Sequence, residues 1–395
     1  MSFLSPTDRF EILRRIECVC LELCSQSMRH STTELEETTT TTTTTTTTND
    51  IYRISIQHPL TLKIRTITNS TSTRSNISLC HMLRVASKIY EAVLKKNTAT
   101  LRALYYQNRD LFIYQTASNL TLSLCSQLLR VRRPLLSIFA TGRGVVWGPL
   151  HIYDNNKTLI GNCNTDRSPH GLRIADGLAF ARGLQFESLG TVQEKPQFIL
   201  VVEKESAFNA IVEEIVRQKR KGAAVIPFVM LSGNGMPSLA TREFLRVMKT
   251  NLQIPALGLF DCNPDGIGVM LSYLYTSNAS INSLGWVAQR SDYTITEMYW
   301  LGVTTHMVEL EAQFRGLRMK DAWKIASGTH SQRDLTRFRT LSMHPKIKSN
   351  SKMQKELETQ QSKNLKFEID QLSYCGSIYN LIEQSAKHEH WIKLE

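Results

Sequence analysis

Apolar residues recur every three or four positions in the N-terminal half of the chain, a spacing typical of helices that bury one face. The pattern predicts helices over residues 10–28, 79–94 and 116–129, and a short helix or turn over 101–106. Residues 38–48 are all threonine and have no apolar partner, so we interpret them as a flexible linker or an expanded repeat. Residues 51–67 alternate apolar and polar positions and predict an extended arm.

Two apolar segments, residues 135–140 and 145–152, flank a glycine-containing turn at 142–144. They predict a β-hairpin. Helices followed by such a hairpin are typical of a winged helix, in which a helix and the hairpin grip duplex DNA. Other small α+β domains show the same pattern.

A different pattern begins near residue 198, where short continuous apolar runs alternate with amphipathic segments. The runs at 198–202, 223–231 and 255–260 predict buried strands, and helices are expected over 207–217, 239–249 and 267–275. This alternation indicates a parallel, doubly wound α/β sheet. In such sheets functional groups gather at the carboxyl ends of the strands.

The charge balance of the 395 residues indicates a class of partner. Lysine and arginine number 47 against 35 acidic residues, a formal net charge of +12. This surplus favours a polyanion, nucleic acid first and an acidic membrane surface second, although a solvated basic surface would have the same composition. The eight cysteines show no zinc-ligand spacing, which favours free thiols in a reducing compartment.

The sequence predicts neither a membrane span nor a signal peptide. No apolar run approaches the roughly 18 residues of a membrane span. The N-terminus carries charges where a signal peptide needs an apolar core. A cytosolic or nuclear protein is therefore expected.

Acidic residues follow two of the predicted strands directly. Glu203 comes after the first and Asp261 after the third. Because parallel strands end at one edge of a sheet, the two carboxylates should converge, and hard oxygen ligands suit Mg²⁺ or Mn²⁺. The alternative is that these carboxylates cap helices or form surface ion pairs.

A glycine loop, residues 232–235, follows the second strand and precedes a helix. Its amides could bind a phosphate. The chain has no Walker A motif, so we do not expect it to hydrolyse ATP itself.

Tyr105 and Tyr106 form a doublet about a hundred residues before the acidic strand ends. A phenol with a pKa of about 10 is ionised in roughly one molecule in a thousand at pH 7, so a nucleophilic tyrosine needs a neighbouring cation or base. Arg102 lies four residues before Tyr106 and would share a helix face with it.

Together these features resemble the family of the topoisomerase VI A subunit and its eukaryotic relatives that begin meiotic recombination by breaking DNA. The resemblance covers about residues 86–391. Glu203-Lys204 after a strand and Asp261-x-Asn263-Pro-Asp-Gly266 look like a Toprim domain. The tyrosine doublet, the basic segment 130–133, the turn at 142–144 and the loop 232–235 are similar to further family segments.

The resemblance implies a winged-helix (CAP-like) domain followed by a Toprim domain, α+β and α/β in class. The implied boundaries are an N-terminal helix with a threonine-rich extension over 1–78, the winged helix over 79–192, and the Toprim domain with helical additions over 193–395. It also implies a nuclear transesterase that makes double-strand breaks through a 5′-phosphotyrosyl intermediate. Expected partners are duplex DNA, a second copy that shares the active site, and an ATP-binding protein like topoisomerase VI B.

The resemblance also assigns residues. Tyr106 is the implied nucleophile with Arg102 beside it, and Mg²⁺ or Mn²⁺ is the implied cofactor. The implied metal ligands are Glu203, Asp261 and Asn263. The implied DNA contacts are Arg130, Arg132, Arg133, Arg143, Lys204 and Asn234.

The chain departs from the family pattern at several positions. Ala103 stands where an acidic residue is usual, and Asn263 replaces a carboxylate that Asp265 could supply instead. Asn234 and Ser238 replace a lysine and an aspartate. Two alternatives therefore stay open: a DNA-binding relative that no longer cleaves, and a Toprim nuclease that uses water in place of tyrosine.

Overall fold

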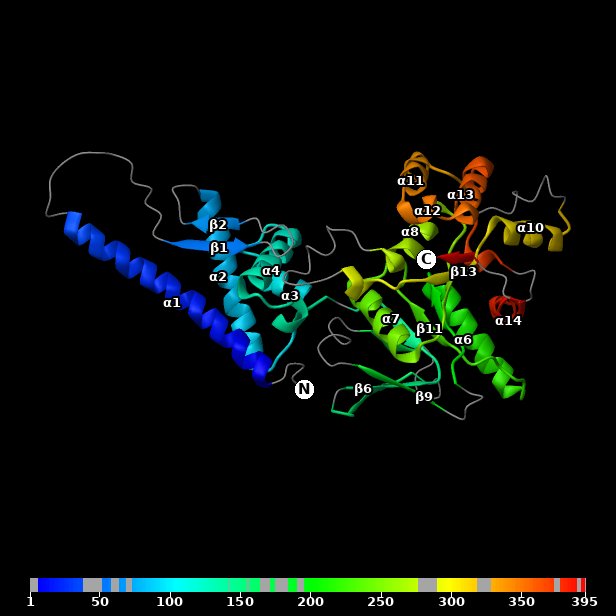
Figure 1. The fold of residues 1–395 in the computed structure, drawn as a ribbon, viewed down its shortest axis with the longest axis horizontal. Helices are drawn as coiled ribbons and strands as arrows, with labels where there is room; N and C mark the ends of the chain where they lie inside the picture. Colours follow the sequence, from blue (N-terminus) through cyan, green and yellow to red (C-terminus); the bar gives the residue numbers. More distant parts are fainter. Residues whose placement is uncertain are drawn as a thin grey trace. The chain divides into compact units, whose positions relative to one another are not determined.

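The computed structural model describes residues 6–37, 52–57, 64–68, 73–140, 142–154, 156–163, 171–174, 184–189, 195–275, 290–317, 328–372, 377–388 and 392–394. The chain divides into two compact units (Figure 1). Unit 1 contains residues 1–141 and 277–290, and unit 2 contains 142–276 and 291–395. The threonine run, predicted to be a linker, lies outside the described residues.

Unit 1 is mainly helical. Its elements are α1 (Pro6–Glu37), β1 (Arg53–Gln57), β2 (Ile64–Thr68), α2 (Thr73–Leu94), β3 (Ala99–Thr100), α3 (Leu101–Tyr106), α4 (Gln115–Leu129), the 3₁₀ helix η1 (Arg133–Leu136) and β4 (Ile138–Phe139). The helices predicted from apolar spacing are confirmed. The extended arm is an antiparallel hairpin of β1 and β2.

The core of unit 1 forms where the apolar stripes of its helices meet. On α2, Val85, Ile89 and Val93 recur one turn apart and are fully buried. They share a cluster with Ile12 of α1 and Leu122 of α4. The three-to-four-residue spacing thus gives each helix one face that leaves water, which is the main stabilising term.

Unit 2 is built around a seven-stranded sheet in the order β16-β13-β12-β10-β11-β5-β8. The four central strands β13, β12, β10 and β11 run parallel, and β16 and β5 flank them antiparallel. The sheet strands are β5 (Val145–Trp147), β8 (Leu172–Arg173), β10 (Ile199–Val202), β11 (Val229–Ser232), β12 (Ala256–Leu259), β13 (Met298–Gly302) and β16 (Ile392–Leu394). The predicted parallel α/β sheet is confirmed, although β11 is shorter than the expected strand over 223–231.

Alternate residues of the central strands supply two separate cores. Ile199 and Val201 of β10 point to a layer with α7 (Leu239–Leu252), α8 (Pro264–Leu274) and α11 (Gln332–Ser342). Leu200 and Val202 point to the other layer, with α6 (Glu205–Arg220), α10 (Thr305–Phe314) and α14 (Ile378–His388). Figure 1 shows α7 and α6 on opposite sides of β11. A strand buried on both faces must be apolar throughout, which explains the continuous runs in the sequence.

Several smaller elements complete unit 2. They are β6 (Leu150–Tyr153), β7 (Leu159–Asn162), β9 (Gln185–Ser188), β14 (Gly328–Thr329), α12 (Pro345–Lys348), α13 (Ser351–Lys363), β15 (Leu365–Lys366) and the 3₁₀ helix η5 (Ile369–Gln371). The 3₁₀ helix η3 (Arg290–Tyr293) begins at the last residue of unit 1 and continues into unit 2. Strands β7, β6 and β9 form a separate three-stranded sheet. The segment from β15 to η5 lies beside Asp261 and Cys262, which follow β12.

The hairpin predicted over 135–140 and 145–152 is wrong. In the described residues β4 pairs with β3, whereas β5 joins the large sheet beside β11. The compact units divide at residues 141 and 142. The domain boundary expected at 192 and 193 stays a prediction. The hairpin prediction fails because the strands pair with partners far away in sequence, which local apolar patterns do not encode.

The seven cysteines in the described residues are free thiols, as predicted, and Cys375 lies outside those residues. No described helix combines the length and the apolar character of a membrane span.

Candidate catalytic tyrosine and carboxylate site

The tyrosine doublet ends a short helix in unit 1. The hydroxyl of Thr100 accepts the Ala103 N–H at 3.0 Å and caps the start of α3. Leu101 and Leu104 anchor the helix in the core. Six residues therefore fix the backbone that carries both tyrosines.

The two tyrosines have different surroundings. Tyr105 is half-buried against the core, and its hydroxyl donates to the Ile113 carbonyl at 3.3 Å. The Tyr106 side chain is 64% exposed, and its ring centroid lies 5.3 Å from that of Tyr105. Tyr106 is thus the more exposed residue of the pair, and the Tyr105 hydroxyl is already bonded to a backbone carbonyl.

Arg102 lies on the same helix, one turn before Tyr106, and is exposed. The expected shared face follows from this spacing. No described residue donates a hydrogen bond to the Tyr106 hydroxyl or accepts one from it. The described surroundings therefore leave this hydroxyl accessible.

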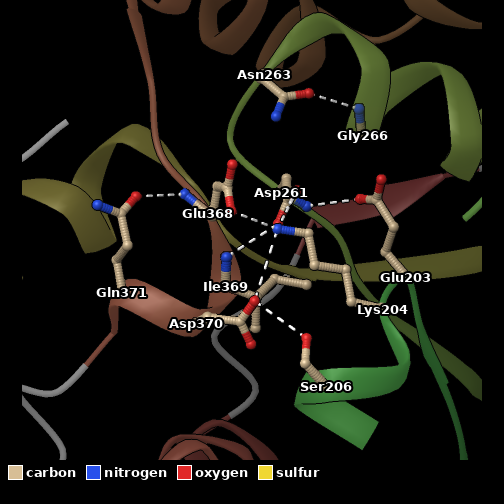
Figure 2. Close-up of polar contacts among 10 residues, drawn as sticks. All are labelled: Glu203, Lys204, Ser206, Asp261, Asn263, Gly266, Glu368, Ile369, Asp370 and Gln371. Carbon is tan, nitrogen blue, oxygen red and sulfur yellow. Dashed lines mark hydrogen bonds and ion pairs between the residues drawn. The ribbon is translucent and has the colours of Figure 1, made fainter. Parts of the chain in front are cut away.

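The two predicted carboxylates meet at the carboxyl edge of the sheet in unit 2. Glu203 follows β10 and Asp261 follows β12, and these neighbouring strands pair Val202 with Leu259. The Glu203 carboxylate (Oε2) accepts the Asp261 backbone N–H at 2.9 Å (Figure 2). Both side chains are buried, so the sheet forces two negative groups together out of water.

This crowding changes the proton affinity of both acids. Burial, followed by the charge of nearby Asp261, raises the pKa of Glu203 to about 7. Burial also raises the pKa of Asp261, although the Ile369 N–H and Lys204 oppose the rise. A cation beside two buried carboxyl groups favours their ionised forms.

Lys204 lies inside this site instead of facing solvent. Its ammonium nitrogen (Nζ) is 3.0 Å from Asp261 Oδ2, 2.8 Å from Glu368 Oε2 and 3.7 Å from Asp370 Oδ2 (Figure 2). Burial lowers its pKa, but the hydrogen bond to Glu368 and the charge of Asp261 outweigh burial and raise it to about 12. The structure therefore gives the predicted DNA contact Lys204 three carboxylate partners within the protein.

The segment between β15 and η5 supplies residues that the sequence did not indicate. Phe367 pairs with Cys262 through two backbone hydrogen bonds, and the Ile369 N–H donates to Asp261 Oδ1 at 2.9 Å. We call residues 367–370 the acidic strap, because Glu368 and Asp370 flank that N–H. The strap lies about a hundred residues after Asp261 in sequence, and no spacing in the sequence relates the two.

Asn263, the third predicted ligand, faces away from the carboxylates in Figure 2. Its side-chain oxygen accepts the Gly266 N–H at 2.8 Å and caps α8. Gly266 packs so close to the Asp261 carbonyl that a Cβ at this position would collide with it. Asp265 pairs with Arg337 at 3.0 Å. The structure therefore brings together Glu203 and Asp261, and places Asn263 and Asp265 in other interactions.

These two carboxylates provide the right kind of donor for Mg²⁺, which commonly takes one or two protein carboxylates and fills its other positions with water and substrate phosphate. No cluster of three or more histidine, cysteine or acidic side chains suited to a metal occurs in the described part of the chain. The residues therefore fit a magnesium site of low ligand count.

The glycine loop uses its polar groups within the protein. The Gly235 N–H donates to the Glu203 carbonyl at 2.8 Å, and the Asn234 N–H donates to the Ser232 hydroxyl at 3.1 Å. The Asn234 side-chain amide donates to the Arg143 carbonyl and to Glu205, each at 3.0 Å. The loop therefore covers the Glu203 backbone, and a phosphate would have to displace these contacts.

The predicted basic contacts are divided between the units. Arg130 is exposed at the end of α4, and Arg132 and Arg133 follow it into η1. Arg143 is exposed just before β5 in unit 2. These positions stay predictions as DNA contacts.

Comparison with known proteins places this geometry in a family. The family model for the Toprim domain of the topoisomerase 6 A subunit and Spo11 matches residues 198–384, which contain both carboxylates and the strap. The model "Type IIB DNA topoisomerase" matches residues 77–138, which contain the tyrosine doublet. Unit 2 therefore contains a Toprim domain, in which the sheet edge carries the acidic residues. Together the two models cover more than half of the chain, which belongs to the family of Spo11 and the topoisomerase VI A subunit.

Individual relatives agree with this assignment. The chain is 25% identical to "Meiotic recombination protein SPO11" of Homo sapiens over 324 residues, 82% of this chain and 73% of the relative. It is 28% identical to the A3 subunit of DNA topoisomerase 6 of Oryza sativa subsp. indica over 297 residues, 75% and 60% of the two chains. It is also 28% identical to "Meiotic recombination protein rec12" of Schizosaccharomyces pombe over 207 residues, 52% and 53%.

Proposed function

We propose that this chain breaks duplex DNA by transesterification in the nucleus and so initiates meiotic recombination, with Tyr106 as the nucleophile. The observation that carries the proposal is the asymmetry of the doublet. Tyr106 is 64% exposed, whereas the Tyr105 hydroxyl is hydrogen-bonded to the Ile113 carbonyl. The relatives named as meiotic recombination proteins and DNA topoisomerases support the choice of DNA as substrate.

The proposed reaction exchanges one phosphodiester for another. The Tyr106 phenolic oxygen attacks a backbone phosphorus, a bond to that oxygen forms, and the bond from phosphorus to the 3′ oxygen breaks. The phenol loses its proton and the released 3′ oxygen gains one. The products are a 5′-phosphotyrosyl link and a 3′ hydroxyl. Arg102, one helical turn before Tyr106, is the cation that we propose to act beside it.

Glu203 and Asp261 are the residues that would hold Mg²⁺ or Mn²⁺, and the bound ion would stabilise charge that develops on the phosphate and the leaving oxygen. Both carboxyl groups are buried and have raised pKa values, which supports a cation at this position. The basic residues Arg130, Arg132, Arg133 and Arg143 are proposed phosphate contacts.

We further propose the assembly that this chemistry needs. Cutting two strands requires two tyrosines, so the active unit is a homodimer whose sites each combine Tyr106 of one copy with the carboxylates of the other. An ATP-binding partner like topoisomerase VI B would control it, because the sequence carries no Walker A motif. The winged-helix assignment of the tyrosine-bearing region belongs to the same proposal.

Recovery of covalent protein–DNA adducts tests the nucleophile. Duplex DNA is incubated with the full chain, Mg²⁺ and the B-like partner, and the adducts are isolated under denaturing conditions. Tyr106→Phe should reduce adducts by roughly a thousandfold or more, because it removes the attacking oxygen. Tyr105→Phe is the matched control and should retain them. Adducts that survive Tyr106→Phe and disappear with Tyr105→Phe would show that the nucleophile is misassigned.

A second function is favoured by Asn263. Its oxygen caps α8 and it carries no charge, so the proposed metal site has two carboxylates in place of three. A DNA-binding relative that no longer cleaves would bind duplex DNA and give no adduct with Mg²⁺ and the partner present. The same adduct experiment separates the two functions.

A further inference from the structure

The ammonium of Lys204 is shared among carboxylates that have different exposures. A lysine has three N–H donors, and three carboxylates surround this one. Asp261 is buried, whereas the Glu368 and Asp370 side chains are 47% and 42% exposed. The same cation thus pairs with one proposed metal ligand and with two acids of the strap.

The strap also contacts the second carboxylate oxygen of Asp261. The Ile369 N–H holds Oδ1 at 2.9 Å, and Lys204 lies 3.0 Å from Oδ2, so both oxygens of this carboxylate are engaged. Glu368 is itself oriented, because it caps η5 and its N–H donates to the Gln371 side chain at 2.9 Å. A divalent cation at Asp261 must therefore compete with Lys204, and the position of the ammonium depends on Glu368.

We propose that Lys204 is a built-in counter-cation that competes with a divalent metal for Asp261, and that Glu368 is a positioning residue that draws the ammonium away from Asp261. This inference rests on the proposed function, because it assumes that the metal binds Glu203 and Asp261. The proposal predicts that neutralising Lys204 tightens metal binding and that neutralising Glu368 weakens it.

The first consequence concerns Lys204 itself. Lys204→Met keeps the length of the side chain and removes its charge, so Mn²⁺ binding should tighten by roughly tenfold or more. Lys204→Gln is a second neutral variant in case the methionine disturbs packing. Lys204→Arg keeps the charge and should bind Mn²⁺ about as tightly as the wild type.

The second consequence concerns Glu368. Glu368→Gln keeps an oxygen that can accept the ammonium but removes the negative charge, so Lys204 should shift toward Asp261 and Mn²⁺ binding should weaken by roughly three- to tenfold. In the Lys204→Met background, Glu368→Gln should have little effect on Mn²⁺ binding, because the ammonium through which Glu368 acts is absent. A general field effect of Glu368 would persist in both backgrounds.

The experiment titrates the full chain with Mn²⁺ in the absence of DNA. The electron paramagnetic resonance signal of the free ion measures how much Mn²⁺ is bound. The titration compares the wild type, Lys204→Met, Glu368→Gln and the double variant, with thermal unfolding to confirm that each is folded. Glu358→Gln is the matched control, because Glu358 is exposed on α13 outside this cluster. Glu203→Gln removes one proposed metal ligand and should reduce Mn²⁺ binding in every background, which would assign the binding to this site.

Tighter binding in Lys204→Met, weaker binding in Glu368→Gln and loss of the Glu368 effect in the double variant are the expected results. If Glu203→Gln removes binding and neither neutral Lys204 variant tightens it, the inference is overturned while the metal site stands. An equal Glu368 effect in both backgrounds also overturns it. If neither the wild type nor the Lys204 variants bind Mn²⁺, the metal site and the inference fail together.

Discussion

The tyrosine and the carboxylates are positioned in opposite ways. Tyr106 lies on a six-residue helix whose cap, Thr100, and whose anchors, Leu101 and Leu104, are its immediate neighbours in sequence. Asp261 follows the end of one strand, and it is held by Lys204 at the start of α6 and by the acidic strap about a hundred residues later. One site is local and exposed, and the other is long-range and buried.

The two arrangements should respond differently to mutation. A locally built, exposed site should lose its chemistry without loss of stability. A buried site assembled from distant segments should lose geometry, stability and pH response together. Three predictions test the contrast.

The largest effect is expected from Phe367→Ala in the strap. Phe367 is 1% exposed, and its removal should lower the free energy of unfolding of unit 2 by about 3–5 kcal/mol through the cavity left behind. Chemical denaturation measures the loss. Phe314→Ala is the matched control, since Phe314 is 62% exposed on α10 and should cost less than about 0.5 kcal/mol.

Amide hydrogen exchange in Phe367→Ala tests whether the effect stays at the carboxylate site and leaves the tyrosine helix unchanged. The Ile369 amide donates to Asp261, so it should exchange faster in Phe367→Ala. The Ala103 amide, which donates to the Thr100 hydroxyl at 3.0 Å in α3, should not change. Equal acceleration at both amides would contradict the local character of the tyrosine site.

The next effect is a pH dependence from Glu203. Its pKa is raised from 4.5 to about 7 by burial and by Asp261, so the folded state holds a proton that the unfolded chain releases. This stabilisation is present below about pH 4.5 and is lost as the pH rises through about 7, on the order of 3 kcal/mol. Glu203→Gln should remove that slope.

Denaturation of the metal-free wild type and Glu203→Gln across this pH range checks the prediction. Exposed Glu358→Gln should follow the wild type. Added Mg²⁺ should reduce the loss in the wild type at high pH, because a cation favours the ionised pair. Parallel curves for the wild type and Glu203→Gln would show that the burial of this carboxyl has no such effect.

The smallest effect is expected within the tyrosine doublet. Tyr105→Phe loses the 3.3 Å hydrogen bond to Ile113 and should destabilise unit 1 by about 1 kcal/mol or less. Tyr106→Phe should change stability by less than about 0.5 kcal/mol, because its side chain is exposed. Urea unfolding compares them. A larger loss from Tyr106→Phe would mean that its hydroxyl is tied to structure.

Much of the fold could be predicted from the sequence, and the failures have a common cause. The helices over α1, α2 and α4 and the parallel core of β10, β11 and β12 follow from local apolar spacing. The hairpin at 135–152 failed because β5 pairs with β11, more than eighty residues away. Local patterns report which face of a segment is buried, and they do not report which strand lies beside it.

The candidate site divides in the same way. The sequence predicted that Glu203 and Asp261 would converge, because both end parallel strands, and the structure brings them together. It also grouped Asn263 with them, whereas the structure uses the Asn263 oxygen to cap α8. Glu368 and Asp370 were missed, since nothing in their spacing points to Asp261.

The sequence alone specified the periodic burial that makes the helices and strands, the doublet on its own short helix, and the acids that end two strands. Each of these is encoded within a few residues, because hydrophobic spacing and capping act over one turn or one strand. Only the tertiary structure brings Lys204 to Asp261 and places the acidic strap in contact with these two residues. Those contacts depend on charges brought together by sheet order, and the cost of burying unpaired charge then fixes their arrangement.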